Sequence, residues 1–129
     1  MFTRRKLRVL VVDDDPNFAD LLAVVLDGDP RLTVVGRAAD GAEGVEAAML
    51  LRPDVVVMDV DMPVLDGIEA AHRIRNRLRR TRVVLVSGSD DAVRRAAGVL
   101  RKGGDPQPIA DAVATQKRVA FAATPAFAA

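Results

Sequence analysis

Short apolar runs and longer amphipathic stretches alternate along the whole chain. The apolar runs are rich in β-branched residues and stop abruptly at polar or glycine positions, which is typical of buried strands. We expect strands at Leu7–Val12, Leu32–Val35, Asp54–Met58, Arg82–Val86 and, with a weaker pattern, Gly98–Arg101. Between them, apolar residues recur at helical spacing, which predicts helices over Phe18–Leu26, Ala42–Leu51, Ile68–Leu78 and, at the end, about Pro106 to Ala120.

This alternation predicts the fold class. Strands that are apolar on both faces, each followed by an amphipathic helix, indicate a parallel sheet covered by helices on both sides. Right-handed crossovers then favour a doubly wound α/β domain with a flavodoxin-like, five-stranded sheet in the order 2-1-3-4-5. In that order the first and third strands are neighbours, and ligands are expected at their carboxyl ends.

Composition limits the chain to one domain and removes several function classes. The chain has 129 residues, of which 50% are hydrophobic and 29% charged, with a formal charge of +1, so it can bury a core and has no bulk attraction to nucleic acid. Without cysteine, and with His72 as the single histidine, neither thiolate nor His-cluster metal sites are possible. No apolar run is long enough to cross a bilayer, and no signal peptide is evident, so we expect a cytoplasmic protein.

Acidic residues stand where the first and third strands end. Asp13 and Asp14 close the first strand and Asp59 closes the third. If these strands are neighbours, three carboxylates converge, and an anionic site of oxygen ligands suits a hard divalent cation such as Mg²⁺. The sequence therefore predicts a metal site at this edge of the sheet.

Two further polar residues follow the last strands. Ser87 closes the fourth strand, and Lys102 lies just past the fifth as one of three lysines in a chain with sixteen arginines. A lysine ammonium is a compact charge that suits a phosphoryl oxygen. Acids, a hydroxyl and an ammonium are thus expected around one crevice.

In their order and spacing these motifs resemble the receiver domains of two-component response regulators, especially receivers usually joined to a helix-turn-helix output domain. The likeness covers nearly the whole chain. The stretches that carry it are Val9–Pro16, Arg52–Pro63, Leu65–Glu69 and Val84–Ser87.

The resemblance implies a role for each acid at the site. Asp59 would be the phosphoacceptor, taking a phosphoryl group from the phosphohistidine of a sensor histidine kinase. Asp13, Asp14 and Asp59 would ligate Mg²⁺ together with the backbone carbonyl of Asp61. The chain would not be an enzyme, apart from assisting its own phosphorylation and dephosphorylation.

The resemblance also implies a switch. Ser87 and Lys102 would bind the phosphoryl group and draw their loops inward, which would control a partner or output domain. The side chains of Asp61 and Ser89 occupy positions that tune hydrolysis of the acyl phosphate in this family. We expect no direct nucleic-acid or membrane binding by this chain, and a homodimer is one expected state.

Three departures from the family pattern fall after the fourth strand. Only 15 positions separate Ser87 from Lys102 (102 − 87), about two helical turns fewer than in the family, so the fourth helix is expected to be shortened or absent. Val99 stands at a switch position that is usually aromatic. Gly103 follows the lysine where most members of the family have proline.

Two other functions stay open. The first is a receiver-like interaction module that does not use phosphorylation. The second, more distant, is a phosphatase of the haloacid-dehalogenase type, because Val55–Asp61 also resembles the nucleophile motif of that class. We expect residues 1–120 to form the receiver domain and residues 121–129 to be an apolar, flexible tail.

Overall fold

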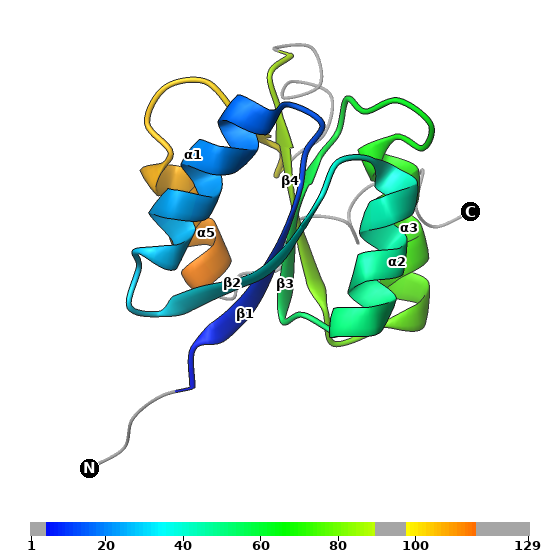
Figure 1. Cartoon of the computed structure of the whole chain (residues 1–129), viewed down its shortest axis with the longest axis horizontal. Helices are drawn as coiled ribbons and strands as arrows, with labels where there is room; N and C mark the ends of the chain where they lie inside the picture. The colour runs from blue at the N-terminus through cyan, green and yellow to red at the C-terminus, as the bar shows by residue number, and fades with distance from the viewer. Residues whose placement is uncertain (1–4, 90–97, 116–129) are drawn as a thin grey trace.

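A computed structural model describes residues 5–89 and 98–115 of the chain. Up to residue 87, strands and helices alternate in it as the hydrophobic pattern predicts (Figure 1). In chain order the elements are β1 (Leu7–Val12), α1 (Pro16–Asp27), β2 (Leu32–Ala38), α2 (Gly41–Leu51), β3 (Val55–Asp59), α3 (Gly67–Arg77), β4 (Arg82–Ser87), β5 (Leu100–Arg101) and α5 (Gln107–Ala114).

The sheet confirms the predicted topology. Its five strands run in the order β2-β1-β3-β4-β5, and every neighbouring pair is parallel. Because β1 lies between β2 and β3, the chain reverses its winding direction there, which makes the carboxyl ends of β1 and β3 the switch point of the fold.

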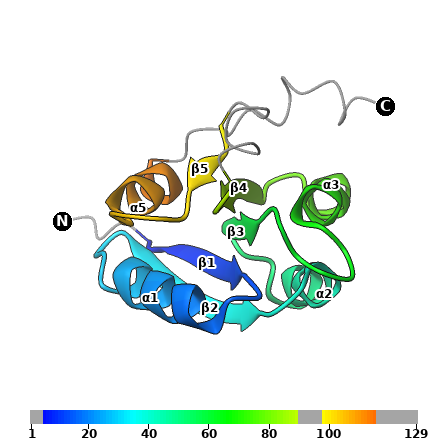
Figure 2. The same ribbon diagram turned by 90° about the horizontal axis from the view of Figure 1, so that it is seen from above.

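The two faces of the sheet have separate cores. Alternate residues of each strand point to opposite sides, so Val9 and Val11 of β1 pack beneath α1 and α5, whereas Leu10 and Val12 pack beneath α2 and α3. Figure 2 shows these two helical layers from above. All four of these β1 side chains are almost fully buried, which explains the uninterrupted apolar run.

Aspartates begin three of the helices. Asp15 accepts hydrogen bonds from the backbone N–H groups of Asn17 and Phe18, and Pro16 occupies the first turn of α1. Asp40 and Asp66 likewise accept from the third residue of α2 and α3. These caps satisfy backbone donors that have no partner within the helix, so part of the acidic content is structural.

Strand β2 is longer than predicted. It continues through Gly36 to Ala38, and its register with β1 shifts at the Val9/Leu10 position. The extra length matters because the backbone oxygen of Ala38 accepts a hydrogen bond from the Asp13 N–H at 3.0 Å. The expectation that β2 ends at Gly36 was wrong because glycine in a strand also marks a bulge.

Strand β5 is shorter than predicted, whereas the predicted end of the last helix lies outside the described residues. Strand β5 is reduced to Leu100–Arg101, and Gly98 before it has a positive φ of 88°. Helix α5 begins at Gln107, and its described part ends at Ala114. The expected end of this helix at Ala120, the shortened fourth helix and the tail at 121–129 all fall outside the described residues.

No helix within residues 5–89 and 98–115 has both the length and the apolar character needed to span a membrane.

Close approach of two backbones fixes the start of α3. A Cβ atom built on Gly67 would overlap the carbonyl oxygen of Asp59, and the Gly67 N–H donates to the Val60 oxygen at 3.0 Å. Glycine is therefore required for α3 to begin directly beside the end of β3.

We predict that Gly67→Ala destabilises the fold by about 2–3 kcal/mol, because backbone atoms must move to admit the methyl group. Urea unfolding would measure the change. Gly88→Ala is the matched control, since no heavy atom in the described part of the chain lies within 4 Å of its added Cβ, and it should change stability by less than about 0.5 kcal/mol. Equal stability of the two variants would contradict this explanation.

Candidate functional site

The parallel sheet brings three carboxylates together at its carboxyl edge. Asp13 and Asp14 follow β1, Asp59 ends the neighbouring β3, and their ligand oxygen atoms all lie within 4.8 Å of one another. Asp13 and Asp59 are only 4% and 2% exposed, whereas Asp14 is exposed. The predicted convergence of the three acids is confirmed.

Backbone amides hold the two buried carboxylates in place. Asp13 Oδ1 accepts from the Asp15 N–H at 2.8 Å, and Asp59 Oδ1 accepts from the Asp61 N–H at 3.2 Å. Each acid therefore bonds to the turn that follows its own strand. Aspartate is suited to this place because its short side chain accepts from the backbone two residues further on.

Lys102 reaches into the acidic cluster from the loop after β5. Its Nζ atom lies 2.8 Å from Asp13 Oδ2 and 3.3 Å from Asp59 Oδ2, and its side chain is only 14% exposed. The backbone N–H of Lys102 donates to the backbone carbonyl of Ser87 at 2.9 Å, which ties the loop to β4. Gly103 therefore does not turn the lysine away from the site.

Burial and mutual repulsion set the charge state of this cluster. Burial, followed by the negative charge of Asp13, raises the pKa of Asp59 to about 7 against the opposing pull of Lys102. Burial acts to lower the pKa of Lys102, but its bonds to Asp13 and the charge of Asp59 raise it overall. The site thus holds more negative charge than one ammonium neutralises.

The donor set fits a hard divalent cation. The Asp13 Oδ2 atom is buried and close to the Lys102 ammonium, yet it accepts no well-aligned hydrogen bond from the described residues, so it keeps a lone pair for an ion beside Asp14 and Asp59. Carboxylate oxygens are the ligands that Mg²⁺ prefers. Asp13, Asp14 and Asp59 could hold such an ion, and the role of the Asp61 backbone carbonyl stays a prediction.

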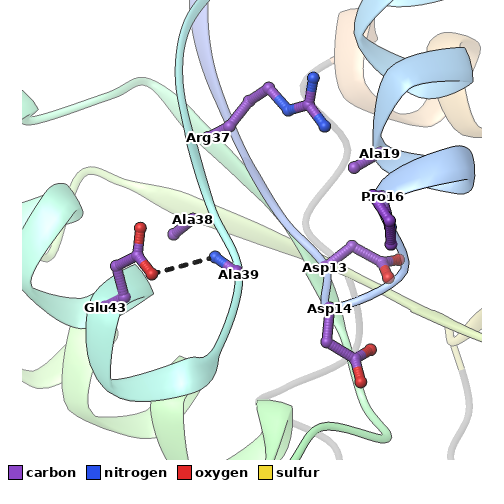
Figure 3. Close-up of a pocket in the computed structure, with 8 residues that line it drawn as sticks. All are labelled: Asp13, Asp14, Pro16, Ala19, Arg37, Ala38, Ala39 and Glu43. Atoms are coloured by element: carbon purple, nitrogen blue, oxygen red, sulfur yellow. Dashed lines mark hydrogen bonds between the residues drawn. The ribbon is translucent and has the colours of Figure 1, made fainter.

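Solvent reaches the acids through a shallow pocket. It has a volume of about 250 Å³ and is lined on one side by Asp13 and Asp14 and on the other by Arg37 and Glu43 (Figure 3). Arg37 binds Asp20, and Glu43 accepts from the Ala39 N–H at 3.4 Å. The exposed Asp14 side therefore offers an approach for an ion.

Ser87 makes a contact that the sequence did not predict. Its hydroxyl donates to Asp61 Oδ2 at 2.8 Å and accepts from the Ser89 N–H at 3.0 Å. The hydroxyl thus joins β4 to the loop after β3 and does not bind the Asp59 carboxylate. No spacing in the sequence indicates this pairing, because the two residues are 26 positions apart.

Phe18 is a second residue that sequence reasoning missed. Its ring lies beneath the Lys102 ammonium, with 4.8 Å from Nζ to the ring centroid. The sequence signal was the apolar stripe of the first helix, which includes Phe18 but does not show what its ring contacts.

Comparison with known families agrees with this geometry. The family model described as the response regulator receiver domain matches residues 9–113. The chain belongs to this family. Recognition of a receiver domain from the motifs is therefore confirmed.

Individual relatives show how far the likeness extends. The chain is 51% identical over 83 residues to protein-glutamate methylesterase/protein-glutamine glutaminase 1 of Geobacter sulfurreducens, a match that covers 64% of this chain and 23% of that protein. The chain thus spans about a quarter of the length of such relatives. The receiver therefore resembles only one part of those methylesterases.

Solved structures of receivers superpose closely on the chain. The receiver domain of the regulator NarL from Mycobacterium tuberculosis has a TM-score of 0.78 at 35% identity, covering 88% of this chain and 100% of that one. CheY in the CheX-CheY-BeF3-Mg+2 complex of Borrelia burgdorferi has a TM-score of 0.70 at 25% identity, covering 84% and 87%. The NarL match agrees with the recognition of a response-regulator receiver.

Neutralising Asp59 should stabilise the metal-free protein. Because the folded-state pKa of Asp59 lies above its ordinary value, ionising this group costs folding free energy as pH rises from about 4 to about 7. We predict that Asp59→Asn is more stable than the wild type by about 1 kcal/mol at pH 8 in a metal chelator, after allowance for screening, and that the gain shrinks at pH 5.

Urea unfolding at both pH values would measure this difference. Asp20→Asn is the control, since Asp20 is exposed and pairs with Arg37, and it should give no gain. A loss of stability in Asp59→Asn at pH 8 would show that repulsion among the acids does not dominate.

Proposed function

We propose that this receiver accepts a phosphoryl group on Asp59, with Mg²⁺ as cofactor, and relays the event as a conformational change. The observation that carries this proposal is the meeting of Asp13, Asp14 and Asp59 within 4.8 Å, with the Lys102 ammonium among them. A site built only to cap helices would not need a buried lysine over two buried acids.

The reaction begins at Asp59. One carboxylate oxygen attacks the phosphorus of a phosphohistidine, so that a phosphorus–oxygen bond forms while the phosphorus–nitrogen bond breaks and leaves its electron pair on the imidazole. The imidazole then takes a proton from solvent. The Asp61 N–H, 3.2 Å from Asp59 Oδ1, orients the nucleophile.

Asp13, Asp14, Asp59 and the backbone carbonyl of Asp61 would hold the ion. Bound there, Mg²⁺ would supply positive charge that offsets the repulsion between an anionic carboxylate and an anionic phosphoryl group. The buried Asp13 oxygen without a well-aligned hydrogen bond supports this assignment. The related CheY complex of Borrelia burgdorferi pairs Mg+2 with BeF3.

Ser87 and Lys102 would sense the new charge. In the unphosphorylated chain the Ser87 hydroxyl is held by Asp61 and the Lys102 ammonium by Asp13 and Asp59. Phosphoryl oxygens on Asp59 would compete with the carboxylates for both donors, since phosphorylation adds negative charge and acceptor oxygens at the site. If the Ser87 hydroxyl and the Lys102 ammonium both changed partners to the phosphoryl group, the loops after β4 and β5 would move. This change is a population shift between two states.

The proposed phosphodonor is a sensor histidine kinase, and the output is a partner protein or a further domain. We also propose a homodimer as one state of the chain. The strand order weakens the phosphatase alternative, because it gives Asp13 and Asp14 a place beside Asp59, whereas the phosphatase motif leaves them without a role. The phosphorylation-independent module is the alternative that experiment must separate.

Phosphorylation can be tested directly by intact-mass spectrometry after incubation with acetyl phosphate. We expect one alkali-labile phosphate adduct on the wild type that requires Mg²⁺, and none on Asp59→Asn. Asp54→Asn is the matched control, because Asp54 lies at the opposite end of β3 and binds Arg5 and Arg8. An adduct on Asp59→Asn would refute the acceptor assignment, and no adduct on the wild type would favour the phosphorylation-independent module.

Metal binding provides a separate prediction. We expect Asp14→Ala to weaken Mg²⁺ affinity at least about tenfold, because it removes one of the few charged ligands. Isothermal titration with MgCl₂ would measure the affinity. Asp20→Ala is the control, because Asp20 is an exposed acid of α1 outside the cluster. This variant should bind Mg²⁺ with the affinity of the wild type. Equal affinities in all three proteins would exclude Asp14 as a ligand.

A further inference from the structure

The Lys102 ammonium has an aromatic neighbour as well as two acidic ones. The Phe18 ring faces Nζ with 4.8 Å to its centroid, within the range of about 6 Å over which a cation is attracted to the negative face of a ring. Asp13 and Asp59 bind the same Nζ atom from the carboxyl edge of the sheet. The cation is thus held between a ring and two carboxylates.

The ring is fixed by the helix that carries it. Phe18 lies in the first turn of α1, where the Asp15 cap and Pro16 set the backbone, and its half-buried ring packs against the core beneath α1 and α5. An aromatic side chain has few rotatable bonds, so this packing leaves it little freedom. Phe18 therefore presents a rigid surface to the lysine.

The loop that carries Lys102 is tied to β4 by the Lys102 backbone N–H, but the residues after the lysine add no side chains. Gly103 and Gly104 follow it, and no heavy atom of the described residues lies within 4 Å of a Cβ built on either one. Gly104 also has a positive φ of 84°. With no side chains on these two residues, the direction of the lysine depends on what its own side chain contacts.

The ring contact differs from the acidic contacts in one respect. Phosphorylation would change the charge at Asp59, and an ion would engage Asp13, so both acidic contacts are altered by the reaction. The Phe18 ring is neutral and belongs to a different element, so its attraction for the ammonium is the same before and after transfer.

We propose that Phe18 is a positioning residue that holds the Lys102 ammonium over the phosphoacceptor site, since the two glycines after the lysine offer it no side-chain support. This inference rests on the proposed phosphoryl acceptance by Asp59. The ring restricts the lysine side chain to a small region. The ammonium is then preorganised to contact the phosphoryl oxygens as the new phosphorus–oxygen bond forms.

Nuclear magnetic resonance tests the positioning without any phosphorylation. The Lys102 side-chain protons should show a ring-current shift in the wild type, and this shift should disappear in Phe18→Leu. Absence of the shift in the wild type would overturn the proposal, whatever the chain does with phosphodonors.

Kinetics with acetyl phosphate tests the consequence, and a small donor avoids any effect on docking of a kinase. We expect Phe18→Leu to lower the phosphorylation rate about three- to tenfold and Phe18→Trp to keep it near the wild-type value. Replacing Phe18 with a multiply fluorinated phenylalanine, which weakens the negative face of the ring at nearly constant shape, should lower the rate while leaving the urea midpoint unchanged.

Two controls separate positioning from a general structural effect. Leu21→Ala, a half-exposed residue on the same helix, should leave the rate unchanged. In a Lys102→Met background, Phe18→Leu should have no further effect on the rate, since the ring then has no cation to position. An equal loss of rate in both backgrounds would overturn the proposal. Failure of the wild type to take up phosphate would instead overturn the proposed function. The ring-current shift would then test only whether Phe18 contacts Lys102.

Discussion

Burial of two like charges beside one lysine is the constraint on which this domain depends. Asp13 and Asp59 are nearly inaccessible, and among the described residues the ammonium that reaches them is that of Lys102. One positive charge does not neutralise the cluster, and burial together with the negative charge of Asp13 raises the pKa of Asp59. A cation at the site would lower the cost of the repulsion. Under the proposed function, the same excess negative charge would make the site sensitive to a bound ion and to a phosphoryl group on Asp59.

The fold maintains this unfavourable cluster with rigid surroundings. The apolar strands β1 and β3 are buried on both faces, and Gly67 allows α3 to start directly against the end of β3. Ser87 and Lys102 are joined through the backbone at the end of β4. Under the proposed function, a change of partner at either side chain would therefore move the loops after β4 and β5 together.

Much of this arrangement was predictable, because each part of it leaves a local pattern. The β-branched runs and the helical stripes indicated alternating strands and helices, since buried parallel strands and amphipathic helices have different periods. Right-handed crossovers then favoured the sheet order. Acids at the ends of the first and third strands predicted the cluster, because that order places those ends side by side. The predicted end of β2 was wrong, since the same glycine can end a strand or accommodate a bulge.

Contacts between distant side chains have no such pattern, and only the tertiary structure decided them. The sequence by itself determined the parallel sheet, the meeting of Asp13, Asp14 and Asp59, and the position of Lys102 in the loop after β5. The three-dimensional packing decided that Lys102 binds both buried acids, that the Ser87 hydroxyl bonds to Asp61, and that the Phe18 ring lies beneath the ammonium. The physical reason is that periodicity fixes which face a residue occupies, whereas side-chain partners depend on how neighbouring elements approach one another.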